Sequence, residues 1–281
     1  MELADIKAVK QVISQFDFSF SKDFGQNFLI DPRIPEQISE ACCDPGDFVL
    51  EIGPGMGTLT SYLGRRAERV GALELDKRLI PVLGETLKEY NNVHVFQGDL
   101  LKTDLNCLSN NVFGEDTPCV AVSNLPYCIT TKAVLALLEC RRFDRVTVMI
   151  QREAAKKLLC EPADEEWCLW SSICNFYSKI ESVGRVSKGC FYPQPSVDSE
   201  IVRFFCRKDI TEDVCKAYRR IASALFSSRR KTIRNTLALS QMFCEKDFNL
   251  ICSQLDIDAG ARGESLTVEQ TERLAKYLIQ E

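Results

Sequence analysis

The chain has 281 residues, of which 45% are hydrophobic and 27% charged, and its formal net charge is −5. These proportions are typical of a globular protein and exclude collagen-like and disordered chains. No apolar run approaches the ~20 residues that a membrane span needs, and the N-terminal residues do not resemble a secretion signal, so we expect a cytoplasmic protein without a membrane partner.

The cysteine and histidine content limits the possible metal and redox chemistry. The chain has 14 Cys and one His, His94. No two cysteines form a Cys-x-x-Cys pair, which disfavours a zinc ribbon or a dithiol redox site. We therefore expect no metal, and reduced thiols that mostly fill the core.

Short apolar runs alternate with helix-length amphipathic segments over the first two thirds of the chain. This alternation is typical of a parallel sheet with helices on both faces, an α/β fold. The expected strands are residues 48–52, 70–75, 93–96, 119–123 and 145–150, and the expected helices between them are 58–66, 77–90 and 132–140.

The pattern changes towards the C-terminus. Residues 178–186 and 199–206 predict an antiparallel pair at a sheet edge, joined by a Pro-rich loop. Three helical patterns follow, at residues 212–226, 245–255 and 267–279, with no convincing strand. We therefore predict a catalytic domain over residues 1–208 and a small helical domain over residues 209–281.

A glycine-rich turn follows the first expected strand and opens a helix. It reads Glu-Ile-Gly-Pro-Gly-Met-Gly-Thr over residues 51–58, with Gly53, Gly55 and Gly57 in a Gly-x-Gly-x-Gly pattern. Glycine lets the backbone approach a ligand closely, and a helix N-terminus offers unpaired N–H groups. The pattern differs from the Gly-x-Gly-x-x-Gly of dinucleotide sites and favours S-adenosylmethionine over NAD.

Two carboxylates follow the next expected strands. Glu74 ends one strand and is placed to accept both ribose hydroxyls of a nucleoside, while Asp99 follows the next strand and is placed near the adenine amino group. Ligands of such sheets bind beyond the carboxyl ends of the strands, where both residues fall. Together with the glycine-rich turn, they predict an adenosyl cofactor.

The segment Asn124-Leu125-Pro126-Tyr127 follows the fourth expected strand, at the same sheet edge. An amide oxygen and a backbone carbonyl oriented by proline can accept hydrogen bonds from the exocyclic N6 of an adenine, and a tyrosine ring can stack on the base. Upstream, Gln26 and Asn27 can meet the polar end of the cofactor. These features predict transfer of a methyl group to an adenine.

Six segments together resemble the ribosomal RNA adenine dimethyltransferase family, from about residue 18 to 281. They are FGQNFL, EIGPGMGTLT, ELD, NLPY, FYPQPSVDS and LFSSRRKTIRN. The resemblance implies a Rossmann-like methyltransferase with a seven-stranded, mostly parallel sheet and a small all-α C-terminal domain. It also implies S-adenosylmethionine-dependent dimethylation of N6 on two adjacent adenosines near the 3′ end of 16S rRNA, in the 30S subunit or its precursor. A monomer, a role in subunit maturation and a link to kasugamycin sensitivity are implied as well.

The resemblance assigns roles to matching residues. Asn27, Leu29, Gly53, Glu74, Asp99 and Asn124 would contact S-adenosylmethionine, residues 124–127 would hold the target base, and Phe191 would stack on its other face.

Basic clusters are the expected RNA contacts, despite the acidic total. The first comprises Arg229, Arg230, Lys231 and Arg234, and a second, for which a solvated face is the better interpretation, comprises Arg141, Arg142, Arg145, Arg152, Lys156 and Lys157.

Three alternatives remain open. The first is a 23S rRNA methyltransferase of the macrolide-resistance type, in which Asn-Ile-Pro-Tyr is more usual than Asn-Leu-Pro-Tyr. The second is a mainly non-catalytic ribosome-assembly factor, which the intact glycine, carboxylate and amide set disfavours. The third is a DNA adenine methyltransferase, which would more typically carry Asp-Pro-Pro-Tyr.

Overall fold

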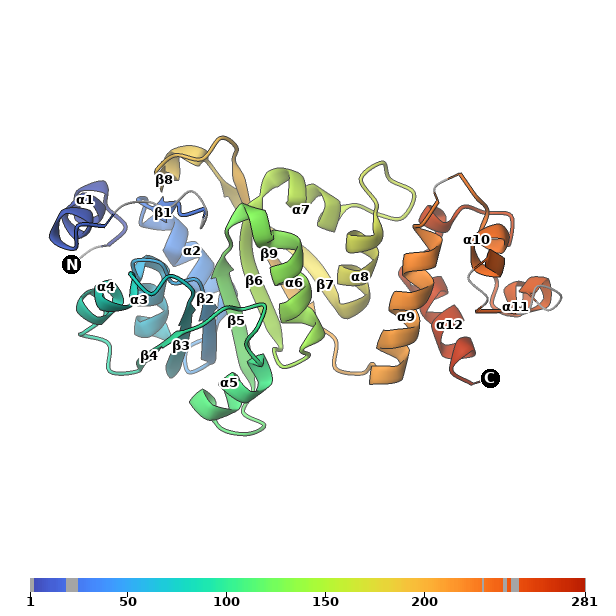
Figure 1. Cartoon of the computed structure of the whole chain (residues 1–281), viewed down its shortest axis with the longest axis horizontal. Helices are drawn as coiled ribbons and strands as arrows, with labels where there is room; N and C mark the ends of the chain where they lie inside the picture. The colour runs from blue at the N-terminus through green and yellow to red at the C-terminus, as the bar shows by residue number, and fades with distance from the viewer. Residues whose placement is uncertain (1–2, 19–24, 229, 240–241, 244–247, 281) are drawn as a thin grey trace. The chain divides into compact units, whose positions relative to one another are not determined.

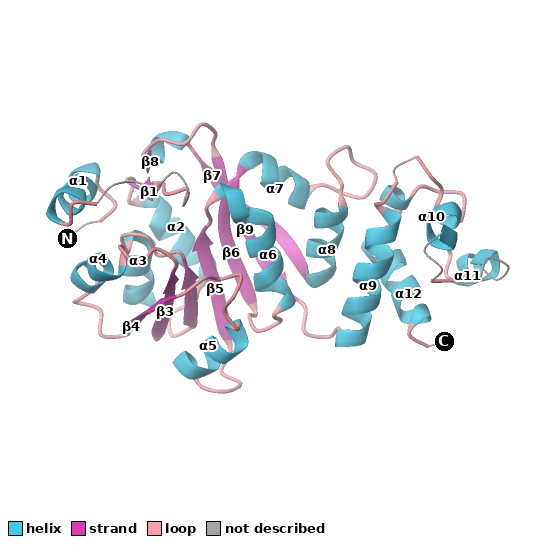
Figure 2. Ribbon diagram, in the orientation of Figure 1, coloured by secondary structure: helices cyan, strands magenta, loops and turns pink. Residues whose placement is uncertain are grey.

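The computed structural model describes residues 3–18, 25–228, 230–239, 242–243 and 248–280. The chain divides into two compact units. The first comprises residues 1–155 and 181–206 and contains most of a mixed sheet with its covering helices, and the second comprises residues 156–180 and 207–281 and is mainly helical (Figures 1 and 2).

A seven-stranded sheet organises the first unit, in the order β4-β3-β2-β5-β6-β9-β7. The pairs from β4 to β6 are parallel, and β9 joins β6 antiparallel. This topology confirms the predicted α/β fold with a mostly parallel sheet. The strands are β2 Phe48–Ile52, β3 Arg69–Glu74, β4 Val93–Gln97, β5 Cys119–Asn124, β6 Arg145–Gln151, β7 Ser178–Val186 and β9 Ser199–Cys206.

Helices connect and cover these strands. Up to β6 they are α1 Ile6–Gln15, α2 Arg33–Cys42, α3 Thr58–Arg66, α4 Ile80–Thr86, α5 Leu105–Phe113 and α6 Thr130–Glu139, and α7 Arg152–Leu159 follows β6. The second unit contains α8 Leu169–Tyr177, α9 Glu212–Leu225, α10 Ile233–Leu239, α11 Phe248–Gln254 and α12 Val268–Leu278.

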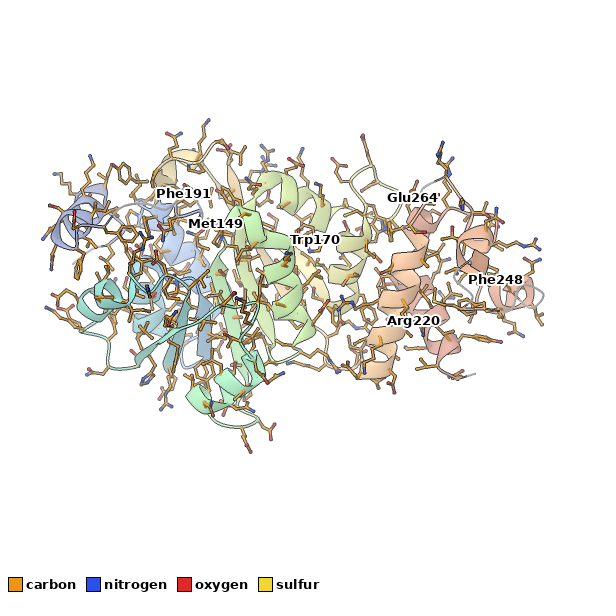
Figure 3. The ribbon with its side chains drawn as sticks, in the orientation of Figure 1. Met149, Trp170, Phe191, Arg220, Phe248 and Glu264 are labelled. Carbon is orange, nitrogen blue, oxygen red and sulfur yellow. The ribbon has the colours of Figure 1, made fainter. Side chains whose placement is uncertain are left out.

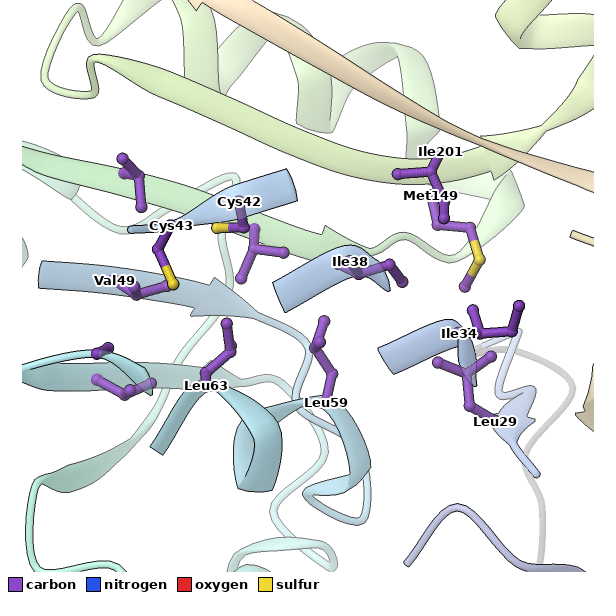
Figure 4. Packing of buried hydrophobic residues seen from close by; sticks show 14 of the residues in the cluster. Leu29, Ile34, Ile38, Cys42, Cys43, Val49, Leu59, Leu63, Met149 and Ile201 are labelled. Carbon is purple, nitrogen blue, oxygen red and sulfur yellow. The ribbon is translucent and has the colours of Figure 1, made fainter. Parts of the chain in front are cut away.

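The two faces of the sheet carry different layers. On one face, Ile38 of α2 and Leu63 of α3 pack in a cluster with Val49, Met149 and Ile201 from three strands (Figure 4). On the other face, the ring of Phe113 in α5 lies 5.7 Å from that of Phe48. Strand side chains alternate between faces, so Glu51 points to the same side as Val49, towards α2 and α3.

The structure differs from the sequence predictions in one helix and in the Pro-rich loop. The expected helix 77–90 is only Ile80–Thr86, and it starts at Ile80 because Pro81 has no N–H and is tolerated only in the first turn of a helix. The Pro-rich loop is not wholly irregular, because β8 (Phe191–Tyr192) within it pairs antiparallel with β1 (Phe28–Leu29). This short ladder holds the N-terminal segment against the loop before β9.

The second unit begins earlier than the predicted boundary near residue 208. Residues 156–180 belong to it because α8 packs on α9: the rings of Phe176 and Tyr218 stack at 3.8 Å, and the Ser172 and Tyr218 hydroxyls hydrogen-bond at 2.8 Å. Arg207 pairs with Glu272 of α12 at 2.8 Å. The helical unit is therefore assembled from two stretches of chain.

Candidate active site

A pocket opens at the carboxyl ends of the parallel strands, where the strand order reverses on either side of β2. This position is the usual ligand site of such sheets. It gathers the turn after β2, Glu74 at the end of β3, Asp99 after β4 and the segment after β5. The predicted site residues that line it are Gln26, Asn27, Leu29, Gly53, Gly55, Glu74, Asp99, Asn124, Leu125, Pro126 and Tyr127.

The glycine-rich turn has left-handed backbone at all three glycines, with φ values of 68°, 63° and 88° at Gly53, Gly55 and Gly57. At Gly55 an added Cβ would come within 3.0 Å of the Phe28 ring, so the turn depends on the missing side chain. Gly53 and Gly55 line the pocket. Gly57 instead precedes α3 as its N-cap, facing Leu87, and shapes the turn.

Glu74 is held by the backbone around it. Its Oε2 accepts a hydrogen bond from Gly55 N–H at 3.0 Å, and its Oε1 accepts one from Asp76 N–H at 2.8 Å. Burial raises the pKa of this carboxyl, and the two N–H donors oppose that rise. Each oxygen keeps a lone pair with which it can accept a ligand hydroxyl.

Asp99 lies on the neighbouring strand end, after β4, in the same pocket and is more open to solvent than Glu74. Its Oδ1 accepts the Leu101 N–H at 2.9 Å, and Lys102 approaches Oδ2 at 3.5 Å. Three carboxyl groups, those of Glu51, Glu74 and Asp99, line the pocket, and none of its described lining residues is Lys, Arg or His. The pocket therefore suits a cationic ligand better than an anionic one.

The N-terminal segment closes one wall. The Gln26 amide donates to Asp76 Oδ2 at 3.0 Å, and Asp76 also pairs with Arg78 at 2.6 Å. The sequence analysis assigned no role to Asp76, which holds the Gln26 amide at this wall. Its place in the ELD segment, two residues after Glu74, could have indicated a residue close to the site. Asn27 donates to the Gly25 carbonyl at 3.1 Å, so both amides are ordered at the pocket wall.

Hydrogen bonds hold the side chains of Asn124, the last residue of β5, and of Tyr127 just after it. The Nδ2 group of Asn124 donates to the Asn27 carbonyl at 3.3 Å, which leaves Oδ1 as the amide atom able to accept another hydrogen bond. The Tyr127 hydroxyl hydrogen-bonds Ser199 at 2.9 Å and fixes the ring. Burial raises the pKa of Tyr127, so its phenol is neutral at physiological pH.

Phe191 does not line the pocket. Its side chain is 3% exposed and belongs to the same hydrophobic cluster as Leu29, its partner across the β1–β8 ladder. It is the first residue of β8 and is labelled in Figure 3. Its stacking on a target base stays a prediction.

The first basic cluster lies in the second unit. Arg230, Lys231 and Arg234 are exposed at the start of α10, whereas Arg229 lies outside the described residues. Sequence reasoning missed Arg219 and Arg220, which border a shallow surface groove on α9 with Ser223 and Met242; Arg220 is labelled in Figure 3. Two adjacent arginines in an amphipathic helical pattern could have indicated this further basic surface.

Two arginines of the second basic cluster form ion pairs or hydrogen bonds within the fold. Arg145 binds Asp44 at 3.0 Å and Asp47 at 2.6 Å, and Arg142 donates to the Thr117 carbonyl at 2.8 Å. These contacts favour a structural role for both arginines.

No helix among the described residues combines the length and the apolarity needed to cross a membrane, and no group of three or more of their His, Cys, Asp or Glu side chains is arranged to hold a metal ion.

The fold, the glycine-rich turn and the amide–aromatic segment at one strand edge define the class of Rossmann-like methyltransferases. The family model described as "Ribosomal RNA adenine dimethylase" matches residues 17–280, and the chain belongs to this family.

Similar proteins agree with that assignment. Ribosomal RNA small subunit methyltransferase A of Bacillus cereus (strain B4264) is 37% identical, covering 99% of this chain and 98% of the relative. A dimethyladenosine transferase from Plasmodium falciparum superposes with a TM-score of 0.76 at 25% identity, covering 90% of this chain and 98% of that one. The 23S rRNA methyltransferase ErmE superposes with a TM-score of 0.69 at 28% identity, covering 90% and 100%.

Proposed function

We propose that this protein uses S-adenosylmethionine to dimethylate N6 of two adjacent adenosines near the 3′ end of 16S rRNA, within the small subunit or its precursor in the cytoplasm. The observation that carries the proposal is that Asn124–Tyr127 lines the same pocket as Glu74 and Asp99. An amine acceptor and an adenosyl donor can therefore meet in one cavity.

The residues present fit the cofactor. Glu74 and Asp99 would hold its ribose and adenine, and the turn at Gly53–Gly55 would lie under its amino-acid part. The Oε2 atom of Glu51 is buried without a hydrogen-bond partner among the described residues, which is the kind of orphaned polar atom that a ligand satisfies. Bound there, S-adenosylmethionine would supply an electrophilic methyl group.

Asn124 and Tyr127 would position the acceptor. Asn124 Oδ1 can accept a hydrogen bond from N6 and turn the nitrogen lone pair towards the methyl group, while the ring of Tyr127 stacks on a base taken out of the helix. The Ser199 contact keeps that ring in one orientation before RNA arrives. Dimethylation requires the monomethylated N6 to rotate and enter the same site again.

The exposed cations of the second unit support an RNA substrate. Arg230, Lys231 and Arg234 can contact phosphates without reading sequence, while the pocket selects adenine. The small-subunit methyltransferases at 37% identity favour the small subunit, and the likeness to ErmE makes the large subunit the alternative to exclude.

The test is methyl transfer from labelled S-adenosylmethionine to undermethylated 30S particles, compared with 50S particles, free rRNA and duplex DNA. The modified nucleoside is identified by mass. We expect N6,N6-dimethyladenosine in the small subunit only. Label in 50S particles would assign the macrolide-resistance activity, and label in DNA the DNA-modifying one. Retained 30S binding without label would indicate a non-catalytic assembly factor.

A further inference from the structure

Two cysteines stand at the two ends of the loop that joins α7 to α8 (Figure 1). Cys160 follows the last residue of α7, and Cys168 directly precedes the first residue of α8. Both are free thiols, and both are partly exposed to solvent. Neither lines the pocket of the candidate active site, and the proposed function uses neither.

Hydrogen bonds bring the two ends of this loop together. The Nδ2 group of Asn175 in α8 donates to the carbonyl of Leu158 at 3.2 Å and to the carbonyl of Ser171 at 3.0 Å. The last turn of α7 is therefore held against the first turns of α8. The chain leaves one helix and enters the next at neighbouring points.

The Ser171 hydroxyl is a neighbour of both sulfur atoms. It hydrogen-bonds Cys168 Sγ at 3.2 Å and accepts the Cys168 N–H at 3.2 Å, as part of the N-terminal cap of α8. The same hydroxyl faces Cys160: burial raises the pKa of the Cys160 thiol, and Ser171 opposes that rise. Cys168 is also near enough to contribute to the raised pKa of Cys160, through repulsion between the two thiolates.

The loop between the cysteines is itself fixed in place. The Glu161 N–H donates to the Asp164 carboxylate at 2.8 Å, and the Trp167 N–H donates to the Asp164 carbonyl at 3.1 Å. The Ala163 N–H donates to the carbonyl of Glu264 at 3.0 Å, and the Trp167 side chain is buried. Because the loop is already ordered, joining its ends costs little further conformational freedom.

We propose that Cys160 and Cys168 are a modification site, at which reaction with a peroxide joins them in a reversible disulfide. Hydrogen peroxide oxidises one thiol to a sulfenic acid and leaves as water. The second sulfur then attacks the sulfenic sulfur, forms the S–S bond and releases a second water. In total, two thiols lose two electrons and two protons, and one peroxide becomes two waters. Thiol reductants can reach the partly exposed bond and restore both thiols.

Mass spectrometry without reduction tests the proposal on the folded, full-length protein. The protein is treated with limiting hydrogen peroxide beside reduced glutathione, its remaining thiols are alkylated, and it is cleaved with a protease that cuts after Glu. Such cleavage separates the two cysteines, because Glu161, Glu165 and Glu166 lie between them. We expect their two fragments to stay joined until a reductant is added.

Glutathione serves as the competing thiol. The Cys160–Cys168 link should exceed mixed disulfides of either cysteine with glutathione by at least about tenfold, because tethered thiols meet at a high effective concentration. The exposed thiols of Cys107 and Cys128 report reactivity that follows from exposure alone. We expect them to be alkylated under limiting peroxide, while Cys160 and Cys168 are protected together.

Cys168→Ser and Cys174→Ala are the matched variants, because the fragment that carries Cys168 also carries Cys174. Cys174 is buried in α8, so its substitution should keep the link, whereas Cys168→Ser should abolish it. If a variant fails to fold, fragmentation of the joined wild-type peptides still locates the bond.

Three results would overturn the inference: glutathione mixed disulfides in place of the link, a bond from Cys160 to another cysteine, or a link that forms only in urea-unfolded protein. The inference is independent of the proposed methyl transfer, so each of these results would leave that function standing.

Discussion

Replacing Phe191 by Ala should lower the unfolding free energy of the first unit, whether or not the ring also contacts RNA. The ring is 3% exposed and packs in the cluster that joins β1, α2 and the sheet. Truncation of a buried Phe to Ala costs about 3–5 kcal/mol, because apolar contacts are lost and a cavity remains. At about 2–4 °C per kcal/mol for a unit of this size, the melting temperature should fall by roughly 10 °C.

Urea denaturation monitored by near-ultraviolet circular dichroism measures this loss, with methyl transfer assayed at a temperature where the variant stays folded. Phe191→Leu is the matched control, because it keeps most of the apolar volume and should cost less than about 1.5 kcal/mol. A Phe191→Ala variant within 1 kcal/mol of the wild type, taking 1 kcal/mol as a rough threshold, would refute a core role for the ring. A stable Phe191→Leu variant with turnover reduced a hundredfold would instead indicate that the ring contacts the base.

Three further substitutions test the site and the RNA contact. Asn124→Ala should lower kcat by about 10²-fold or more, because it removes an acceptor that orients N6, while loss of the hydrogen bond to the Asn27 carbonyl should cost only about 1 kcal/mol in urea unfolding; near-normal turnover would exclude the role. Glu74→Ala should weaken S-adenosylmethionine binding at least about tenfold, about 1.4 kcal/mol, by calorimetry, and an unchanged Kd would make Glu74 purely structural. Replacing Arg230, Lys231 and Arg234 with Ala should reduce the salt dependence of RNA binding by about two to three counterions, and an unaltered slope would place the RNA elsewhere.

Much of the first unit was predictable because its signals are local. The strands β2, β7 and β9 were predicted with their observed ends, since apolar or β-branched runs bounded by turns identify strands without reference to partners. The glycine-rich turn and Asn124–Tyr127 were also recognisable, because each follows a strand in the chain. A parallel sheet brings strand ends to one edge, so the pocket followed from the order of these segments.

The second unit was less predictable, because its boundary depends on partners distant in the chain. The sequence prediction placed residues 156–180 in the catalytic domain. In the structure they belong to the helical unit, where the ring of Phe176 stacks on that of Tyr218. The helix α10 lies in a segment that was interpreted only as a basic cluster. Its first turn is held by hydrogen bonds from Ile233 N–H to the Ala261 carbonyl and from Arg234 N–H to the Ala259 carbonyl. No periodic pattern in the sequence predicts such contacts.

The sequence by itself determined the α/β class, the family and eleven of the 24 residues that line the pocket. Only the tertiary structure decided that Phe191 is a core residue and that the Oε2 atom of Glu51 is buried with no hydrogen-bond partner among the described residues. Both outcomes depend on burial, which is set by segments that pack from elsewhere in the chain: β1 against Phe191, and α2 and α3 against Glu51. The sequence pattern specifies which residues can form a strand or a turn, whereas the environment of a side chain exists only after distant segments have come together.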